Sequence, residues 1–371
     1  MRIVFAGGGT GGHLYPGLAI ARAVQRLRPD IQPFFVGARR GVERDVLPTT
    51  HFPHVLLDLH PLYRATFWNN WRTLVGMTTA WRGIRRVVSD ERPALVVGTG
   101  GYAAGAMLAY AIVHGIPIAQ QASDALPSLT TRLFSRWSRE IYLAIPEAAR
   151  HLRVRSPDAL IDTGAPIEPP PQPRPERNVA RRAWTLADAT RVVLVYGGSQ
   201  GSLAINRAVA DWVKTGLPAG VGLIWATGKA TFQEFASLAS PSVKIQPYLS
   251  PIADAYAASD LAVTRAGMMT IAELCAWHIP SVLIPLPTAA ADHQTKNAKT
   301  LATAGAAVQL SQSDLSGERL GRTIGDLLND SPRLTALARS AASRARPHAA
   351  EEIARRIIAL ADACTSTADR R

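Results

Sequence analysis

The chain has 371 residues, of which 47% are hydrophobic and 19% are charged, and its formal net charge is +13. This length exceeds one ordinary hydrophobic core and predicts two domains, and the composition excludes a disordered chain. Its two cysteines, Cys275 and Cys364, lie far apart and form no disulfide framework, which favours a reducing compartment. The excess of basic residues favours an anionic partner. Arginine-rich codon usage in the genome, with the arginines on ordinary solvated helix faces, explains the excess equally well.

The first half alternates β-type runs with helical patterns. Residues 2–12 read RIVFAGGGTGG, and an amphipathic helical pattern follows them. A strand, a glycine turn and a helix form the first unit of a doubly wound α/β domain. The expected strands lie near residues 2–6, 32–36, 54–59, 95–97, 117–119 and 141–143. This alternation predicts a parallel sheet in an N-terminal domain over residues 1–164.

The uncharged run 94–113 is long enough to raise the question of a membrane span. Its glycines at 98, 100, 101 and 105 divide it into a strand, a loop and a helix, as in a buried α/β unit. Met1 leads directly into the first strand, so we expect no signal peptide.

The middle of the chain is rich in proline. Residues 165–175 read APIEPPPQPRP, which predicts a stiff extended linker over 165–182. Residues 191–201, RVVLVYGGSQG, then repeat the opening pattern. The strands expected in this half lie near 192–196, 222–226, 243–246, 261–264 and 281–284. They predict a second domain over 183–345, and we expect the helical segment 346–371 to cross back to the N-terminal domain.

The glycine loops are the candidate ligand sites, because loops and helix N-termini at the carboxyl ends of parallel strands bind anions. We therefore expect a ligand in a cleft between the two domains. Residues 7–12 contain GxGxxG, but the second strand lacks the acidic residue of a NAD site, and no P-loop lysine follows. His13 starts the helix, as a general base or, alternatively, as a capping residue.

Three further loops extend this pattern. Residues 98–102, GTGGY, should lie beside the first loop and offer more backbone N–H groups to a pyrophosphate. Residues 197–201 and 264–273 repeat the strand, glycine and helix order in the second half. Glu273 is positioned to accept both hydroxyls of a ribose, although an exposed helix glutamate is the alternative.

In their order and spacing, these motifs resemble the peptidoglycan N-acetylglucosaminyltransferases of glycosyltransferase family 28, the MurG family, over about residues 1–360. The matching segments are GGGTGGHLYPGLA, VVGTGGYAAG, LPSLTTRLFS, VLVYGGSQGSLAIN, TRAGMMTIAE, IPSVLIP and DHQTKNA. The resemblance implies a GT-B fold, with two Rossmann-like doubly wound parallel-sheet domains facing a cleft. It also implies inverting transfer of GlcNAc from UDP-GlcNAc to the C4 hydroxyl of lipid I, undecaprenyl-pyrophosphoryl-MurNAc-pentapeptide, to form lipid II. Peptidoglycan synthesis, cell shape and cell division are the implied processes.

The resemblance also implies the site residues. The donor-side contacts are Thr10, Gly11, Gly12, Ser199, Gln200, Leu249, Met268, Met269, Thr270, Glu273 and Gln294. Among them, Ser199 and Gln200 lie at the diphosphate, Leu249 at the uracil and Glu273 at the ribose. The acceptor pyrophosphate is expected at Gly9, Gly100, Gly101 and Tyr102. His13 falls on the family's candidate base.

Two positions depart from the family pattern. Residues 121–124 read QASD, so Asp124 stands where the family has a sugar-contacting Asn and becomes a second candidate base. Glu168 stands at the position of an arginine near the donor phosphates. A carboxylate beside a diphosphate is unfavourable unless a cation intervenes.

The resemblance also implies a peripheral enzyme at the cytoplasmic face of the cell membrane. Phe67, Trp68 and Trp71 are the candidate membrane contacts, and arginines flank them, which suits an anionic lipid interface. The alternative is that this apolar stripe is core.

No cysteine or histidine cluster has metal-ligand spacing, so we expect no tightly bound metal, and a loosely bound Mg²⁺ stays open. UDP-GlcNAc, a polyprenyl-pyrophosphate-linked acceptor and an anionic membrane surface are the expected partners, with other cell-wall and division proteins as further candidates. No nucleic-acid motif accompanies the arginines. The rival functions are another GT-B UDP-sugar enzyme, such as an epimerase, and a catalytically weak nucleotide-sugar-binding paralogue.

Overall fold

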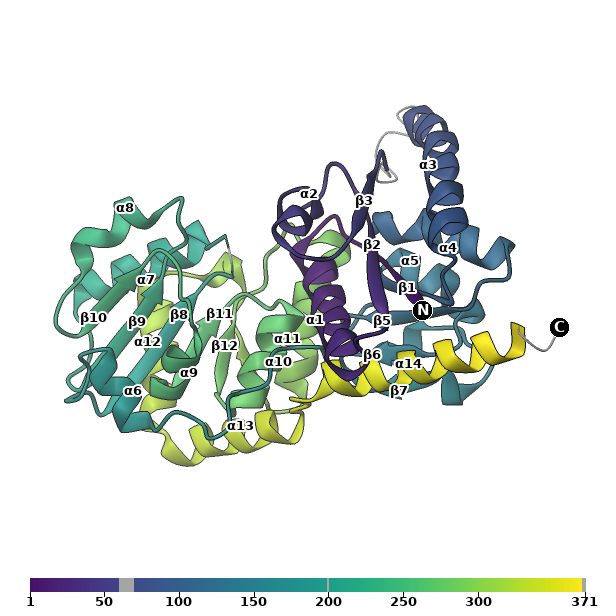
Figure 1. Ribbon diagram of the computed structural model, residues 1–371. Helices are drawn as coiled ribbons and strands as arrows, with labels where there is room; N and C mark the ends of the chain where they lie inside the picture. Colours follow the sequence, from purple (N-terminus) through teal and green to yellow (C-terminus); the bar gives the residue numbers. More distant parts are fainter. Residues whose placement is uncertain (60–69, 199, 369–371) are drawn as a thin grey trace. The chain divides into compact units, whose positions relative to one another are not determined.

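The computed structural model describes residues 1–59, 70–198 and 200–368, and the side chains of residues 1–59, 80–198 and 200–365 (Figure 1). The chain divides into two compact units, Met1–Glu168 with His348–Arg371, and Pro169–Pro347. Each unit is a parallel sheet covered by helices, which confirms the predicted pair of doubly wound α/β domains.

The first unit has a seven-stranded parallel sheet in the order β3-β2-β1-β4-β5-β6-β7. Its strands are β1 (Arg2–Gly7), β2 (Gln32–Ala38), β3 (His54–Leu57), β4 (Leu95–Gly100), β5 (Ile118–Ala122), β6 (Ile141–Leu143) and β7 (Leu160–Asp162). Its helices are α1 (Gly11–Leu27), α2 (Glu43–Val46), α3 (Asn70–Glu91), α4 (Tyr102–Val113), α5 (Leu129–Phe134) and α14 (Ala349–Ala368).

Both faces of this sheet are buried, and alternate residues of β1 serve opposite faces. Ile3 and Phe5 pack with α1 and α14, whereas Val4 and Ala6 pack with α3 and α4. A strand buried on both faces reads as a continuous apolar run, which is why IVFA was recognisable in the sequence. The last helix, α14, returns to this unit, where Ile353 and Ile357 are fully buried.

The second unit has a six-stranded parallel sheet in the order β10-β9-β8-β11-β12-β13. Its strands are β8 (Arg191–Tyr196), β9 (Val221–Ala226), β10 (Val243–Gln246), β11 (Leu261–Thr264), β12 (Ser281–Leu283) and β13 (Ala307–Gln309). Its helices are α6 (Arg177–Ala183), α7 (Leu203–Thr215), α8 (Phe232–Phe235), α9 (Ala253–Ala258), α10 (Met268–Trp277), α11 (His293–Thr303), α12 (Gly317–Asn329) and α13 (Ser331–Ser343). Val193 and Val195 pack on one face of β8, and Val192 and Leu194 on the other.

Three expectations about elements need correction. The edge strands β7 and β13 were not expected, because most of their residues are half-buried or exposed and form no fully buried apolar run, unlike those of the equally short β6 and β12. The linker expected over 165–182 is wrong at its end, since residues 177–183 form α6, whose Ala180 is buried in the core. The division between the units also follows Glu168 rather than residue 164.

The uncharged run 94–113 folds as β4 and α4, as expected. Among the described residues, the structure contains no helix with both the length and the apolar character needed to span a bilayer.

Candidate active site

In each unit the strand order reverses beside the first strand, between β1 and β4 and between β8 and β11. Ligands of open α/β sheets bind at the carboxyl ends of the strands at such a reversal. The loops that follow these four strands are the glycine loops identified in the sequence. The fold therefore gives each unit one candidate site at the expected edge of its sheet.

The loops after β1 and β4 are in direct contact, as expected. A Cβ atom added to Gly100 would lie 2.6 Å from His13 Cδ2 and 3.0 Å from its Nε2, so the imidazole edge packs on this glycine. The Oγ1 of Thr10 lies 3.0 Å from His13 Nδ1. If Nδ1–H donates to this hydroxyl, the basic lone pair is on Nε2, at the edge that faces the second loop.

The N-terminus of α1 presents the remaining residues of the first loop. Its first backbone hydrogen bonds run from the N–H groups of His13 and Leu14 to the carbonyl of Thr10. The N–H groups of Gly11 and Gly12 precede these bonds and belong to the orphan donors of a helix N-terminus. Gly12 is exposed, so this end of the helix suits an anion.

A buried carboxylate, which sequence reasoning missed, holds the first loop by accepting hydrogen bonds from its backbone. The side chain of Glu43 is fully buried and accepts the N–H of Gly9 at 3.0 and 2.9 Å and the N–H of Ala38 at 2.9 Å. We expected the amide of Gly9 to face a pyrophosphate, but this amide is used inside the protein. No sequence motif marks Glu43, although a Cβ atom on Gly8 or Gly41 would overlap its carboxylate.

The second loop is anchored by its neighbours. Thr130 of α5 donates its hydroxyl to the carbonyl of Gly101 at 2.9 Å. The ring of Tyr102 packs on Gly9, where an added Cβ atom would lie 2.7 Å from its Cε1. Gly100 and Gly101 have φ of 97° and 76°, values that glycine adopts without strain.

The departure at residues 121–124 lies at the end of β5, next to β4 in the sheet. Gln121 is fully buried and accepts a 2.6 Å hydrogen bond from the hydroxyl of Ser123. Asp124 follows on the loop and is partly exposed. Asp124 and His13 therefore follow strands β5 and β1, which are separated by β4.

In the second unit, the loop after β8 closes tightly. Gly201 donates its N–H to the carbonyl of Gly198 at 3.0 Å, and Ser202 caps α7 through the N–H of Ile205. Gly201 approaches the backbone of Gly228 after β9 so closely that any Cβ atom would overlap it. Gln200 is exposed on this loop, and Ser199 lies outside the described residues.

The loop after β11 presents a helix N-terminus. The N–H groups of Met268, Met269 and Thr270 precede the first hydrogen bond of α10, from Ile271 N–H to the carbonyl of Gly267 at 3.0 Å. Met268 has 5% of its surface exposed, so its side chain belongs to the core. Arg265 is a nearby cation whose Nη1 donates to the carbonyls of Ile284 and Pro285, and burial lowers its pKa.

Glu273 is oriented by two tyrosines that sequence reasoning missed. The hydroxyl of Tyr256 donates to Glu273 Oε2 at 2.8 Å, and it lies 2.9 Å from the hydroxyl of Tyr196. Because each hydroxyl has one hydrogen, Tyr196 must donate to Tyr256. Burial and the carboxylate of Glu273 raise the pKa of both tyrosines, so both stay protonated donors. Glu273 is partly exposed, as a ribose contact requires.

Two further predicted donor-side residues follow strands of the second sheet: Gln294 is the second residue of α11, and Leu249 lies on the loop after β10. The side-chain carbonyl of Gln294 accepts the N–H of Leu286 at 3.0 Å, which fixes the loop after β12. Leu249 is buried with Tyr196 and Tyr256, so its side chain packs in the core.

The remaining candidates lie elsewhere. Glu168 is exposed at the end of the first unit. Phe67 and Trp68 lie outside the described residues, and so does the side chain of Trp71, whose backbone belongs to α3. Cys275 is core rather than catalyst, because burial raises the pKa of its thiol to about 11.

Comparison with known proteins agrees with this geometry. Residues 3–143 match the glycosyltransferase family 28 N-terminal domain, and residues 192–353 match its C-terminal domain. A relative from Salinibacter ruber is 38% identical over 97% of this chain and 97% of its own length. A second, from Moorella thermoacetica, is 36% identical over 95% of this chain and 97% of its own. Both are named UDP-N-acetylglucosamine–N-acetylmuramyl-(pentapeptide) pyrophosphoryl-undecaprenol N-acetylglucosamine transferase.

Solved structures give the same result. The crystal structure of Acinetobacter baumannii MurG has a TM-score of 0.76 at 26% identity, covering 95% of this chain and 98% of its own. A Staphylococcus aureus MnaA–UDP co-structure, at 12% identity and a TM-score of 0.65, covers 95% of each chain and shares the fold alone. On the matches to both domain models and to these full-length relatives, the chain belongs to glycosyltransferase family 28.

Proposed function

We propose that this chain transfers N-acetylglucosamine from UDP-GlcNAc to the C4 hydroxyl of undecaprenyl-pyrophosphoryl-MurNAc-pentapeptide, and so acts in peptidoglycan synthesis and thereby in cell shape and division. The observation that carries the proposal is the second unit's combination of a helix N-terminus with an oriented carboxylate at one strand reversal. The amides of Met268 to Thr270 suit a diphosphate, and Glu273 suits a ribose. The names of the relatives from Salinibacter and Moorella supply the sugar and the acceptor.

In this proposal the acceptor hydroxyl attacks C1 of the donor sugar, the C1–O bond to UDP breaks, and His13 Nε2 takes the proton. The Oγ1 of Thr10 lies 3.0 Å from Nδ1, and Nε2 is the base in the tautomer in which Nδ1–H donates to this hydroxyl. The electron pair of the broken bond stays on UDP, whose added charge is stabilised by the N–H groups of α10 and by Arg265. Asp124 is the alternative base, because it follows β5, which is separated from β1 only by β4.

We further propose that catalysis needs no tightly bound metal. The helix N-terminus and Arg265 supply positive potential for the diphosphate, and no group of three metal-ligand side chains occurs where side chains are described. Loosely bound Mg²⁺ is the alternative, and chelation separates the two.

The test is transfer of labelled GlcNAc onto a lipid I analogue by the purified protein, with and without EDTA. We expect labelled lipid II in both reactions. Consumption of UDP-GlcNAc without a lipid acceptor would instead favour an epimerase, and normal UDP binding without any turnover would favour a weak paralogue. Activity lost with EDTA and restored by Mg²⁺ would contradict the metal-free proposal.

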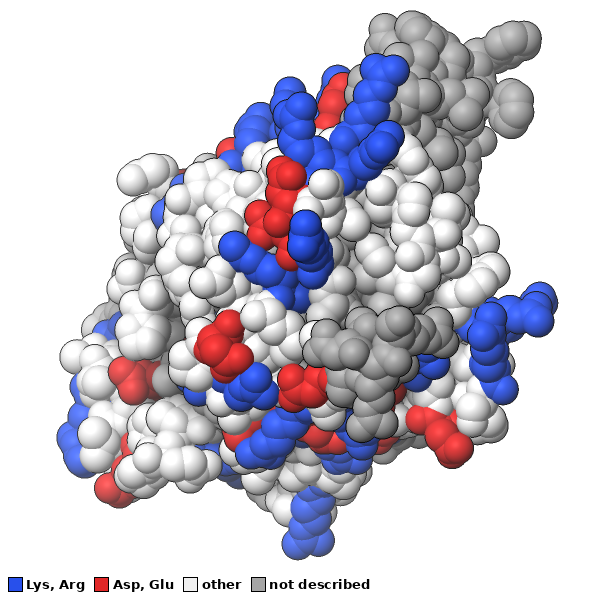
Figure 2. Space-filling view, turned by 45° about the vertical axis from the view of Figure 1, so that its right-hand side comes forward, with Lys and Arg blue, Asp and Glu red and all other residues white. Residues whose placement is uncertain are grey.

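We also propose that the protein docks on an anionic membrane surface through α3, at the cytoplasmic face of the cell membrane. Arg82, Arg85 and Arg86 are exposed at helical spacing on α3, whereas Ile84 and Val87 face the core. Figure 2 shows Lys and Arg side chains gathered at the upper end of the face that it presents. Each basic side chain near an anionic bilayer contributes about 1 kcal/mol.

The test is sedimentation with phosphatidylglycerol vesicles. Arg82→Gln, Arg85→Gln and Arg86→Gln together should weaken binding by about 100-fold at low salt, since three contributions of about 1 kcal/mol are removed. The matched control, Arg182→Gln with Lys214→Gln and Arg319→Gln, removes the same charge from exposed positions of the second unit. If vesicle binding weakens equally in both variants, the effect comes from the net charge of the protein, and this outcome would contradict an α3 docking surface.

A further inference from the structure

A hollow lies in the second unit, at the opposite edge of its sheet from the donor loops. It has a volume of about 360 Å³, and it is lined where β8, β11 and β12 begin, by Arg191, Asp260 and Pro280. The donor loops lie where β8 and β11 end. Because β8 has six residues, the two sites are about 20 Å apart along the strand.

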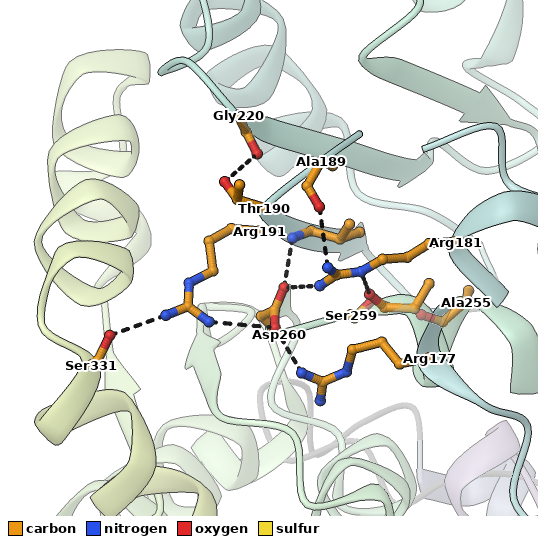
Figure 3. A network of polar contacts seen from close by, with 12 residues as sticks. Arg177, Arg181, Ala189, Thr190, Arg191, Gly220, Ala255, Ser259, Asp260 and Ser331 are labelled. Carbon is orange, nitrogen blue, oxygen red and sulfur yellow. Dashed lines mark hydrogen bonds and ion pairs between the residues drawn. The ribbon is translucent and has the colours of Figure 1, made fainter. Parts of the chain in front are cut away.

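Asp260 is the one carboxylate among the residues that line this hollow, and it is already neutralised (Figure 3). It is almost fully buried and bonds to Arg181 Nη2 at 2.5 Å and to the N–H of Val192 at 2.7 Å. Arg181 is buried too, and its other nitrogens donate to the carbonyls of Ala258 and Ala189. This pair satisfies the requirement that a buried charge be matched and hydrogen-bonded.

Three more arginines line the same hollow. Arg177 lies 3.1 Å from Asp260, with 57% of its side chain exposed, and Arg191 lies 3.8 Å from it. Arg191 also donates to the hydroxyl of Ser331 at 3.0 Å, at the start of α13. Arg174 donates to the carbonyl of Ala276 at 2.8 Å and lies 5.8 Å above the ring of Trp277. Each guanidinium is thus oriented by protein groups at the rim of a cavity.

The charges in this hollow do not balance. With Asp260 matched by Arg181, the three lining arginines leave an excess of three positive charges. His278 lines the hollow as well, and burial together with Arg174 lowers its pKa. A planar guanidinium group binds two phosphoryl oxygens at once through two of its N–H groups. The volume of 360 Å³ lies within the range of pockets that bind small ligands.

We propose that this hollow is a second anion site, separate from the donor site, which binds a soluble phosphoryl anion of diphosphate size. Arg174, Arg177 and Arg191 are its ligands. Asp260, held by Arg181, orients Arg177 through their ion pair and fixes the start of β8 through the N–H of Val192. A phospholipid headgroup offers the same chemistry, so the experiment separates a free anion from a membrane.

The experiment is calorimetric titration of the full-length protein with inorganic pyrophosphate at low ionic strength, after saturation with UDP. Saturation removes the donor diphosphate site from the measurement. We expect one pyrophosphate site per chain that depends on the three lining arginines, and any pyrophosphate held by the acceptor loops of the first unit should remain in the variant that lacks them. Arg174→Gln with Arg177→Gln and Arg191→Gln should weaken the affinity at least about 10-fold, because charge-assisted contacts are lost. The control Arg182→Gln with Lys214→Gln and Arg319→Gln, which line neither site, should retain it.

Retained UDP binding establishes that the variants fold. If the triple variant does not fold, Arg174→Gln alone serves, because Arg174 contacts neither Asp260 nor Arg181 in the contacts described above. No pyrophosphate binding in the UDP-saturated protein, or equal weakening in the control, would overturn the proposal. Loss of phosphatidylglycerol vesicle binding in the pocket variant, without a soluble pyrophosphate site, would overturn it in favour of a membrane contact.

Discussion

At the scale of single residues, the clearest prediction concerns Glu273 as a contact of the donor. Glu273 is partly exposed in the middle of α10, and its carboxylate accepts a hydrogen bond from Tyr256. Glu273→Ala should weaken UDP affinity by about 1–3 kcal/mol, the range for loss of a charged hydrogen-bond partner. Calorimetry with UDP measures this, and Glu234→Ala, an exposed glutamate on α8, is the control. Unchanged affinity in Glu273→Ala would remove this residue from the site.

Tyr256 supports Glu273 by donating a hydrogen bond to its carboxylate. Tyr256→Phe removes the hydrogen bond to Glu273 and leaves the ring in the core. It should weaken UDP affinity by about 0.5–1.5 kcal/mol, less than loss of the carboxylate itself. In the double variant with Glu273→Ala, the tyrosine change should add little. Additive effects would show that Tyr256 acts on the donor independently of Glu273.

His13 and Asp124 compete for the role of base. His13→Ala should reduce turnover by about 10²–10⁴-fold, the range for general acid–base catalysis, with little loss of UDP affinity. Thr10→Val should give a smaller loss, because it removes the group that lies 3.0 Å from Nδ1. If His13→Ala keeps near-full turnover and Asp124→Asn abolishes it, the base is Asp124. If both are inactive and bind UDP normally, the pH–rate profiles of the conservative variants His13→Gln and Asp124→Glu separate their roles.

At the scale of elements, the first glycine loop depends on the short helix α2. Glu43 of this helix is the acceptor for two buried N–H groups, those of Gly9 and Ala38. Glu43→Ala leaves both without a partner and should lower the free energy of unfolding by about 1–3 kcal/mol per N–H group. Glu43→Gln keeps a carbonyl acceptor and should cost less. Denaturant unfolding of both variants measures the difference.

The control for Glu43 lies on the same helix. Asp45 is exposed and forms a surface ion pair with Arg44. Asp45→Ala should therefore cost less than about 1 kcal/mol. If Glu43→Ala also costs less than this, the carboxylate is not holding the loop. If Glu43→Ala is destabilising but leaves transfer unchanged, its role is in stability alone.

The elements show what the sequence could and could not predict. Long strands such as β1 and β8 were predicted because they are buried on both faces and end in glycines. The edge strands β7 and β13 are only partly buried and lack the continuous apolar run that marks the equally short β6 and β12. Residues 177–183 were assigned to the linker because prolines precede them, but tertiary contacts of Ala180 and Arg181 make them helical.

The site shows the same division. Residues on the glycine loops could be predicted because their chemistry follows directly from strand, turn and helix order. Glu43, Tyr196 and Tyr256 could not, since each acts through a hydrogen bond to a residue of another element. Tyrosine and glutamate in apolar runs resemble ordinary core or surface residues until the fold brings them to a partner. Positioning residues of this kind carry no local signal.

At the scale of the whole molecule, the two units have separate cores. The clusters of the first unit include residues of α1, α4 and α14, whereas those of the second lie on elements from α6 to α13. The donor-side residues from 200 to 294 belong to the second unit. The first unit is completed by the end of the chain, because Ile353 and Ile357 of α14 pack with Leu14 and Leu18 of α1.

This separation predicts that a core defect in the first unit leaves donor binding intact. Ile357→Ala deletes methylene and methyl groups from a fully buried side chain and should destabilise the first unit by about 2–5 kcal/mol. Under conditions where the variant is still folded, its UDP affinity should equal that of the wild type. Leu327 is an equally buried position of the second unit, and Leu327→Ala is the matched comparison. In this variant, UDP binding should be lost as the second unit unfolds. A fall in UDP affinity in folded Ile357→Ala would mean that the first core also shapes the donor site, and binding could then no longer be assigned to the second unit alone.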